Sequence, residues 1–493
     1  MSDKMIGMYV HQHWPYNYPY AARTWQVDDW RGYAGCLRKI GYNAMLIWPL
    51  LEMMPDPLPP SDKRYLENMS RVIAMLKHEL DMKVFIALCP NVWAVSEVAA
   101  RSSICDRNFF YSDIRINPGD RNALDTMIRW REKLLEPLKL VDGVTIIDSD
   151  PGGYAGSTNQ EYVNLLLEHR RMLDRIRPGI ELVYWMHAGW QAYSRFYETG
   201  SFEFGLEDEF IDTLQRLSQA DPKPWAIANG FAFAEKLGLG DRVYGYNYGA
   251  IEGEPSFPMT NFGGDLAYNA GAMAMPRGVL GNAQTHCAQL PNTFAFVRGA
   301  LGKPVSNDDY LEFAEGLAPG HGAKIVRGWQ TLTGTDAKPA RAAREELNNI
   351  PCGALKEGDL GGLLFGSPAR FVNDLCMMLD MCGSCIDLCN ALNNGAGHRA
   401  ALREFVTAAD MWQAKHGYRN RWNWPDLFEA LKKLNSPGVN HAITMPLDQA
   451  IGTSFAKVKE AYYMEENHTL QVLQSLKRAL IGKERLGPQR GWL

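Results

Sequence analysis

Several features that would assign a chain to a class of proteins are missing from this sequence. No apolar run of membrane-spanning length is free of charged or helix-breaking residues, and residues 1–7 lack the apolar stretch of a signal peptide. The formal net charge of −5 supplies no positive surplus for nucleic acid or for an acidic membrane. We therefore expect neither a nucleic acid nor a membrane as a partner.

Cysteine is sparse and irregularly placed. The nine cysteines are odd in number and scattered over 493 residues, which is unlike the framework of a disulfide-rich secreted protein. Reduced thiols favour a cytoplasmic location. Four cysteines recur with the spacing of one helix face: Cys376, Cys382, Cys385 and Cys389. This spacing predicts a buried stripe of side chains on one helix, with a metal site as the weaker alternative.

The composition is that of an ordinary globular protein with many aromatic side chains. Hydrophobic residues make up 46% and charged residues 22%, and 493 residues predict two or three domains. Many of the 14 tryptophans and 21 tyrosines follow expected strands. Flat aromatic side chains at such positions suit sugar rings, although large cores also use large residues.

One stretch combines a buried strand with two carboxylates. The β-branched run 144–147 predicts a strand, which ends at Asp148 and Asp150 before a Pro-Gly-Gly turn. A helix with Thr158 as its N-cap is expected to follow. Because strand side chains alternate, Asp148 and Asp150 should point to the same side, where their like charges raise one pKa, as acid/base chemistry requires. The alternative is a polar strand end joined to the helix cap.

Strand and helix patterns alternate through the first 303 residues. The expected strands cover residues 5–10, 43–48, 83–88, 144–147, 181–185, 225–228, 242–246 and 278–280. This order predicts an α/β fold, a (β/α)8 TIM barrel over residues 1–303. A doubly wound sheet would also alternate, but no glycine-rich phosphate motif follows the first strand.

Helical spacing dominates beyond residue 303. The expected helices cover residues 308–316, 340–348, 369–392, 400–416, 424–434 and 456–480. We therefore expect a C-terminal α-helical domain over residues 304–493.

Polar and aromatic residues cluster after the expected strands rather than before them. Since the carboxyl ends of barrel strands share one mouth, Asp148, His187 and Asn282 should converge despite their separation in sequence. The expected catalytic residues are Asp148, Asp150 and Glu254, with Glu252 as a substitute for Glu254. The expected substrate-binding residues are His11, His13, Trp48, Asn91, Trp185, His187, Tyr246, Tyr248, Asn282, Gln284 and His286.

The histidines and acids at these strand ends also allow a metal site. His11 and His13 on the first strand, with Asp148, Asp150 and His187, could bind zinc as in barrel amidohydrolases. Against this, the fourth strand carries no lysine, and Asn282 takes the place of an aspartate at the end of the eighth.

Glycoside hydrolysis suits the same residues, because it needs a proton donor at the leaving oxygen and a second carboxylate. Asp148 and Asp150 can supply the pair, or one of them can act with Glu254 or Glu252. The order of features over residues 5–303 resembles barrel glycoside hydrolases of the broad group that holds hexosaminidases and α-glucuronidases. The likeness rests on residues 148–153, on the tryptophan-rich strand ends and on residues 282–285.

The resemblance has one departure. Hexosaminidases that use the acetamido group of their substrate carry two adjacent acids where Ser149 here separates them, so the likeness does not imply substrate assistance. Inverting sialidases also use such barrels, and arginines of this chain could bind a sugar carboxylate, with surface arginines as the alternative: Arg101, Arg107, Arg115 and Arg195.

We expect an exo-acting glycoside hydrolase for a terminal amino, uronic or sialic acid sugar, because long loops after strands one, three and five would wall the pocket. Asp150 is the first choice for the general acid, and Asp148 for its partner. A carbohydrate substrate is the expected partner, no cofactor or metal is expected, and a homodimer is left open. The alternatives are a metal-dependent barrel hydrolase of the amidohydrolase type and a carbohydrate-binding barrel without catalysis.

Overall fold

The computed structural model divides into two compact units. The first reaches Val305 and the second begins at Ser306, except that residues 288–291 group with the second. The structure describes residues 4–13, 17–94, 103–107, 113–149, 152–200, 203–221, 223–247, 251, 275–283, 288–332, 334–394 and 398–416.

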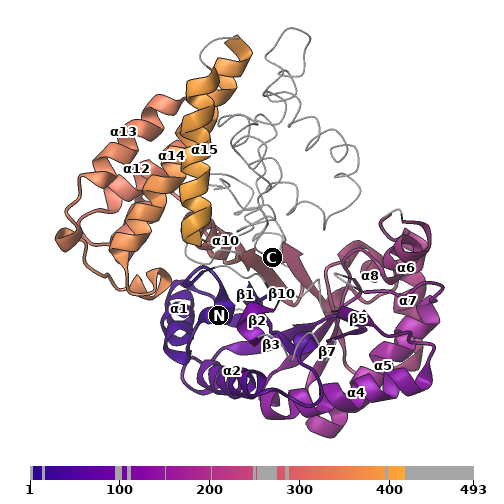
Figure 1. Ribbon diagram of the computed structural model, residues 1–493. Coiled ribbons are helices and arrows are strands. Elements are labelled where there is room, and N and C mark those ends of the chain that lie inside the picture. Colours follow the sequence, from indigo (N-terminus) through magenta and orange to yellow (C-terminus); the bar gives the residue numbers. More distant parts are fainter. Residues whose placement is uncertain are drawn as a thin grey trace. The chain divides into compact units, whose positions relative to one another are not determined.

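Eight parallel strands of the first unit close into a barrel, in the order β1-β2-β3-β6-β7-β8-β9-β10 and back to β1. The barrel expected from the sequence is therefore confirmed (Figure 1). The strands are β1 Met5–His11, β2 Ala44–Trp48, β3 Lys83–Leu88, β6 Gly143–Ile147, β7 Glu181–Trp185, β8 Ala226–Ala228, β9 Val243–Asn247 and β10 Gly278–Ala283.

The structure differs from the sequence-based strands in a few places. Strand β10 extends to Ala283, so Asn282 lies within the strand rather than after it. A short antiparallel pair, β4 Val92–Ala94 and β5 Asp113–Arg115, forms in the long segment after β3 and was not expected.

Helices surround the barrel (Figure 1). They are α1 Val27–Ile40, α2 Pro60–His78, α4 Arg121–Leu135, α5 Asn159–Ile176, α6 Trp190–Thr199, α7 Glu207–Ala220, α8 Phe231–Lys236 and α10 Leu290–Ala300. Short 3-10 turns join them: η1 Ala22–Thr24, η2 Leu51–Met53, η3 Ile104–Asp106, η5 Glu136–Leu138 and η6 Gly240–Arg242.

Helix α5 begins as the sequence predicts. The Thr158 hydroxyl accepts a hydrogen bond from the Glu161 amide at 3.3 Å, and the Glu161 carboxylate accepts one from the Thr158 amide at 2.7 Å. This reciprocal capping box satisfies two amides that the first turn leaves without a helical partner. It fixes where the chain turns from the loop after β6 into the outer helix layer.

Strand register determines which side chains enter the barrel. Tyr9 is aligned with Leu46 on one side and with Asn282 on the other, and its ring lies 5.4 Å from that of Trp185 across the barrel. Side chains in phase with Tyr9 along the aligned strands therefore point inward. Ile147 is aligned with Trp185, so Ile147 faces inward and its neighbour in the chain faces the helices.

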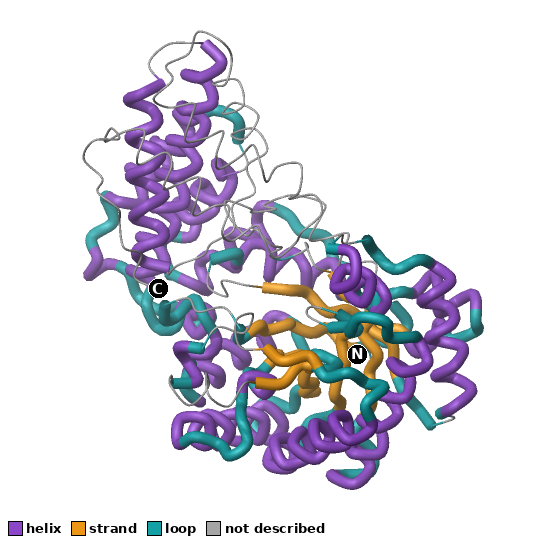
Figure 2. The backbone as a smooth tube through the Cα atoms, turned by 45° about the vertical axis from the view of Figure 1, so that its right-hand side comes forward, coloured by secondary structure: helices purple, strands orange, loops and turns teal. Residues whose placement is uncertain are grey.

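The second unit, within the described residues, is helical (Figure 2). Its helices are α11 Asn307–Leu317, α12 Gly322–Leu332, α13 Ala337–Asn348, α14 Pro368–Asn394 and α15 His398–His416, with 3-10 turns η7 Cys352–Ala354 and η8 Gly361–Leu364. The C-terminal helical region is thus confirmed, whereas the helices expected at 424–434 and 456–480 lie outside the described residues.

Helix α14 is the core of this unit and packs on α12, α13 and α15. Among the described helices, it alone is long and apolar enough to cross a membrane by length and composition, but 56% of its most apolar window is buried in the unit. Cys376 and Cys382 belong to that buried face, and burial raises the pKa of both thiols to about 11. These two cysteines pack as core residues, while Cys385 and Cys389 are half-buried.

Candidate functional site

Aromatic rings from distant strands meet inside the carboxyl-terminal half of the barrel. Tyr9 lies 5.4 Å from Trp185 and 5.7 Å from Tyr246, and the rings of Trp185 and Tyr246 are 4.4 Å apart between centroids. Trp48 approaches from the other side, 6.5 Å from Tyr9. Trp48, Trp185 and Tyr246 were predicted as site residues, and the barrel brings them together around Tyr9, which the sequence analysis did not single out.

Two histidines extend this cluster beyond β1. The rings of His11, His13 and Trp48 lie pairwise 4.8 Å apart, and the His13 amide donates to Nδ1 of His11 at 3.1 Å. Burial, and then the charge of Arg23, hold the pKa of His13 well below its ordinary value. His13 is therefore neutral at physiological pH and serves as a packed ring of the site wall.

Arg23 holds this end of β1 in place. Its guanidinium donates to the carbonyl oxygens of Gln12 at 2.8 Å, Cys105 at 2.8 Å and Arg107 at 2.9 Å, and also to that of His13. A buried arginine with backbone carbonyls as its acceptors ties the chain after β1 to the segment after β3. The position of the two histidines is thus set by a hydrogen-bonded frame.

Glu52 also reaches this cluster. Its Oε1 accepts hydrogen bonds from the Cys89 amide at 2.6 Å and from the Trp48 indole at 3.2 Å, while Oε2 lies 3.8 Å from Nε2 of His13. Burial raises the pKa of this carboxyl group. Glu52 belongs to the polar residues that follow the expected strands, but it was not among the expected catalytic or substrate-binding residues.

Asp148 is completely buried just beyond β6. Its Oδ1 accepts hydrogen bonds from the Ser149 hydroxyl at 2.8 Å and from the amides of His187 and Gly189, each at 3.1 Å. Its Oδ2 accepts one from the Tyr184 hydroxyl at 3.4 Å. Burial raises the pKa of Asp148, whereas the charge of His187 and the hydrogen bonds from Ser149 and from the amides of Gly189 and His187 act against that shift.

The direction of the Asp148 side chain corrects one expectation. Ile147 faces into the barrel, so Asp148 faces outward, where the ring of its partner Tyr184 packs on Tyr162 of α5. Asp148 does lie on the same rim as His187 and Asn282, but its carboxyl group holds the loop after β7 and does not enter the barrel. A continuous apolar strand could not reveal this, because both of its faces are buried.

Asn282 faces the barrel interior, whereas His187 lies beyond the end of β7. His187 is half-buried and has Nδ1 3.0 Å from the Ser149 hydroxyl. Asn282 is aligned with Tyr9 and is buried. The rest of the expected set lies outside the described residues: Asp150, Glu252, Glu254, Tyr248, Gln284 and His286.

Asn91 lies at the same rim but acts on the backbone. Its amide nitrogen donates to the carbonyl oxygens of Ile116 and Gly153, each at 2.9 Å, and the side chain is completely buried. It thereby joins the segment after β3 to the loop after β6. Gly152 helps this loop to fold back, since a Cβ there would lie 2.7 Å from the Asp148 carbonyl oxygen.

The arginines considered for a sugar carboxylate are mostly engaged elsewhere. Arg107 forms a buried two-pronged ion pair with Asp62, at 2.6 and 3.0 Å. Arg195 pairs with Glu209. The guanidinium of Arg115 lies 4.5 Å from the centre of the Tyr197 ring, and Arg101 lies outside the described residues.

The donor set for a metal is incomplete in the part of the chain that the structure describes. There, no group of three histidine, cysteine, aspartate or glutamate side chains lies close enough to hold an ion. Of the expected ligands, Asp148 faces away from the barrel and Asp150 falls outside the described ranges.

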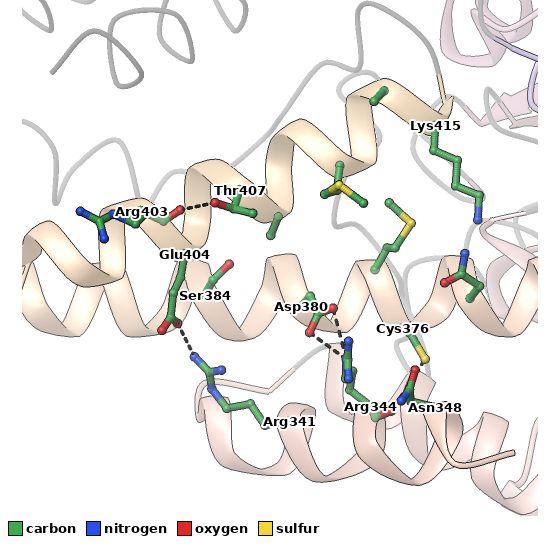
Figure 3. Close-up of a pocket in the computed structure, with 15 residues that line it drawn as sticks. Arg341, Arg344, Asn348, Cys376, Asp380, Ser384, Arg403, Glu404, Thr407 and Lys415 are labelled. Atoms are coloured by element: carbon green, nitrogen blue, oxygen red, sulfur yellow. Dashed lines mark hydrogen bonds and ion pairs between the residues drawn. The ribbon is translucent and has the colours of Figure 1, made fainter. Parts of the chain in front are cut away.

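A groove of about 760 Å³ lies elsewhere, between α13, α14 and α15. Two ion pairs cross this groove, as Figure 3 shows for Arg344 with Asp380 at 3.1 Å and for Arg341 with Glu404 at 3.0 Å. It lies in the helical unit, away from the strand ends on which the sequence placed the expected site residues.

No protein-family model matches the sequence, and no curated protein matches it either. Solved structures do match. A family 89 glycoside hydrolase from Clostridium perfringens is 10% identical with a TM-score of 0.49, over 97% of this chain and 63% of that one. A GH138 enzyme targeting pectin rhamnogalacturonan II is 9% identical with a TM-score of 0.48, over 92% of this chain and 70% of that one.

Matches are not confined to glycosidases. A protein assigned as a dihydrodipicolinate synthetase, from Pseudomonas aeruginosa, is 14% identical with a TM-score of 0.33, over 76% of this chain and all of that one. Glycoside hydrolases of several families recur among the matches.

Proposed function

We propose that the chain is a glycoside hydrolase that removes a terminal sugar at the carboxyl-terminal mouth of its barrel. The observation that carries the proposal is the ring cluster of Tyr9, Trp48, Trp185 and Tyr246. Sugar rings stack on such faces, and the polar groups beside them, His187 and Asn282, match sugar hydroxyls.

A buried indole supports the same proposal. Trp185 is 2% exposed, and among the described residues its N–H has no hydrogen-bond acceptor. An unpaired buried donor costs about 1–3 kcal/mol, and a sugar hydroxyl bound beside the ring would satisfy it.

The catalytic acids of the proposal come from the sequence pattern. Asp150 is the proton donor, and Glu254, or Glu252 in its place, is the second carboxylate. In this proposal Asp148 supports the site from behind rather than touching the sugar, because its carboxyl group is fully buried and faces outward. Tyr248, Gln284 and His286 remain proposed substrate contacts.

The test is hydrolysis of a panel of nitrophenyl glycosides and natural disaccharides by the purified chain. On a disaccharide, Asp150→Asn should lower turnover by about 10²- to 10⁴-fold, because general acid catalysis is lost. Nitrophenyl glycosides, whose leaving group needs less protonation, should lose less. The matched control is Asp125→Asn on the outer helix α4, where the carboxylate pairs with Arg121.

Each outcome separates the proposal from its alternatives. Equal, near-wild-type rates for Asp150→Asn on both substrate types would assign the acid to another residue, with Glu254 and Glu252 next. Binding of sugars without hydrolysis of any glycoside would favour a carbohydrate-binding barrel.

A further inference from the structure

The turn after β3 is held in place by Arg131 of helix α4. Nη1 of Arg131 donates to the carbonyl oxygen of Pro90 at 2.9 Å, and Nη2 donates to that of Val92 at 3.1 Å. Arg131 is buried, so bulk water does not compete for these acceptors. Because the two carbonyl groups flank Asn91, Arg131 fixes the backbone on both sides of this residue.

Asn91 connects this turn to the loop after β6. Its amide nitrogen donates to the Gly153 carbonyl oxygen at 2.9 Å. Pro90 packs on the same loop, since a Cβ added at Gly152 would lie 2.9 Å from its Cγ. Asp150, the proposed general acid, precedes these two glycines by two and three positions in the chain. The path of the loop that carries Asp150 therefore depends on the turn that Arg131 holds.

His169 of α5 supplies a third acceptor for Arg131. Nε2 of its ring lies 2.7 Å from Nη1 of Arg131, and its Nδ1 lies 2.8 Å from the carbonyl oxygen of Leu165. A guanidinium group can only donate and a carbonyl oxygen can only accept, so Nε2 accepts and Nδ1 carries the proton. The arrangement therefore requires a neutral His169.

The surroundings of His169 keep its ring neutral. Burial, and then the charge of Arg131, lower the pKa of His169 to about 3, while the hydrogen bond with Leu165 acts against that shift. Burial also lowers the pKa of Arg131, and the charges of Glu52 and Cys89 act in the other direction. Protonation of His169 would remove the acceptor and place two buried cations 2.7 Å apart.

We propose that Arg131 and His169 are positioning residues for the general acid. The neutral ring of His169 keeps the Arg131 guanidinium on the turn after β3, and Asn91 in that turn holds the loop that carries Asp150. The role of Asp150 rests on the proposed function. The hydrogen-bonded frame does not, because all of its groups belong to the free protein.

Three variants separate the hydrogen bond from the ring. His169→Phe keeps a ring but deletes the acceptor, whereas His169→Gln offers an amide oxygen as an acceptor and cannot titrate. Arg131→Lys keeps the charge but replaces a planar fork by a single ammonium group, which cannot match the directions of three acceptors.

The matched control is His416→Phe on α15. His416 is also buried, and its Nδ1 lies 3.0 Å from the carbonyl oxygen four residues earlier. Burial lowers the pKa of His416 to about 3 as well. The control thus removes a similar ring from the helical unit and leaves the frame of the barrel intact.

Amide hydrogen exchange tests the frame without any substrate. Peptides that cover residues 91–94 and 152–154 should exchange about 10-fold faster in His169→Phe and Arg131→Lys than in wild type, the equivalent of one hydrogen bond to a charged group. The same peptides should keep wild-type rates in His169→Gln and in His416→Phe. Unchanged exchange in His169→Phe would overturn the frame.

Thermal unfolding tests the charge state of His169. Because its pKa falls from about 6.5 in the unfolded chain to about 3 in the fold, its contribution to stability is present above pH 6.5 and is lost as pH falls. The Tm advantage of wild type over His169→Gln should therefore shrink between pH 7 and 4. A constant difference over this range would show that the fold does not hold His169 neutral, and would overturn the arrangement.

Turnover tests whether the frame positions the acid. On a disaccharide that the wild type hydrolyses, His169→Phe and Arg131→Lys should lower kcat about 10- to 100-fold and change KM less, because a misplaced catalytic group loses its alignment with the substrate. Nitrophenyl glycosides should lose less, since their leaving group needs less protonation. His169→Gln and His416→Phe should stay close to wild type on both substrate types.

The outcomes distinguish the frame from the proposed function. Equal losses on both substrate types in His169→Phe, or no loss at all, would overturn the positioning role. If the wild type hydrolyses no glycoside, the proposed function fails and with it the role of Asp150, while hydrogen exchange still decides the frame.

Discussion

Four carboxyl groups, two at each end of the barrel, are held in different ways. At the amino-terminal end, carboxylates pair with cations: Asp142 accepts both hydrogen bonds of Lys77, at 2.7 and 2.8 Å, and Glu181 pairs with Arg277. At the carboxyl-terminal end, in the described part of the chain, neither Asp148 nor Glu52 has a lysine or arginine within ion-pair distance, although the charge of Arg131 acts against the rise in the pKa of Glu52.

We interpret the amino-terminal ion pairs as contributing to stability, and the buried carboxyl groups at the other end as part of the candidate site. The ion pairs at the amino-terminal end stay partly exposed, so forming them costs little desolvation free energy. The guanidinium of Arg277 also lies 4.5 Å from the centre of the Tyr244 ring. Asp148 and Glu52 at the other end are desolvated and accept hydrogen bonds from neutral donors, an arrangement that costs free energy and suits a site. Barrel enzymes place their chemistry at the same end.

The largest expected effect comes from truncating the satisfied carboxyl group. Asp148→Ala leaves the amides of His187 and Gly189 buried without an acceptor, and we expect the barrel to lose about 3 kcal/mol of unfolding free energy. Glu181→Ala, at the other end, should cost about 1 kcal/mol, since Arg277 can turn to water. Calorimetry of both variants measures the contrast, and equal losses would show that the two ends do not differ.

A smaller effect is expected for the indole of the site. Trp185→Phe keeps most of the ring but removes the N–H, and we expect KM to rise about 2- to 10-fold for a hydrolysed glycoside. Trp30→Phe, on α1, removes an equally buried N–H that also has no acceptor within the described residues, and KM should not change. Similar shifts in both variants would place the effect in packing rather than in substrate binding.

The pH dependence of stability should differ in sign between two glutamates. Burial raises the pKa of Glu52, so the folded state holds its proton longer, and stability falls as pH rises from about 4 through the raised pKa. The Tm advantage of wild type over Glu52→Gln should therefore shrink between pH 4 and 8.

Glu79 provides the opposite case. Its hydrogen bond with Arg31 lowers the pKa of this surface carboxylate, so wild type should gain relative to Glu79→Gln as pH rises toward neutrality. Thermal unfolding of the three proteins across the pH range measures both trends. A Glu52 difference that grows with pH would mean that Glu52 is ionised in the fold.

The smallest effect should come from metal removal. If hydrolysis depends on an acid/base pair of carboxyl groups and on no metal ion, a chelator should leave the rate unchanged, and elemental analysis should find no stoichiometric zinc. Activity lost on chelation and restored by Zn²⁺ would move the function to the metal-dependent alternative, with His11, His13 and His187 as ligands.

The sequence predicts the barrel well because its signals are local. Each strand is a short apolar run, each helix has a 3.6-residue period, and Thr158 and Glu161 mark where α5 begins. The same locality made the site only partly predictable. The sequence singled out Trp48, Trp185, Tyr246 and Asn282, which the structure brings together around Tyr9, from their place after or at the end of strands.

What escaped prediction depends on register. Tyr9 sits between apolar residues of a fully buried strand, so nothing local shows that its ring enters the barrel. The direction of the Asp148 side chain could not be predicted for the same reason. Only the alignment of Ile147 with Trp185 shows which way the next side chain points. The contact of Glu52 with the Cys89 amide joins residues that are far apart in the sequence, so no local pattern predicts it.

Arg23 has a consequence for how this protein can be modified. Its guanidinium binds carbonyl oxygens of Gln12 and His13 on one loop and of Cys105 and Arg107 on another. These acceptors are backbone oxygens, so single substitutions in either loop leave them in place, whereas a graft that changes the path of one loop moves acceptors away from a buried cation. A loop graft at this mouth should therefore exchange both segments together with the arginine.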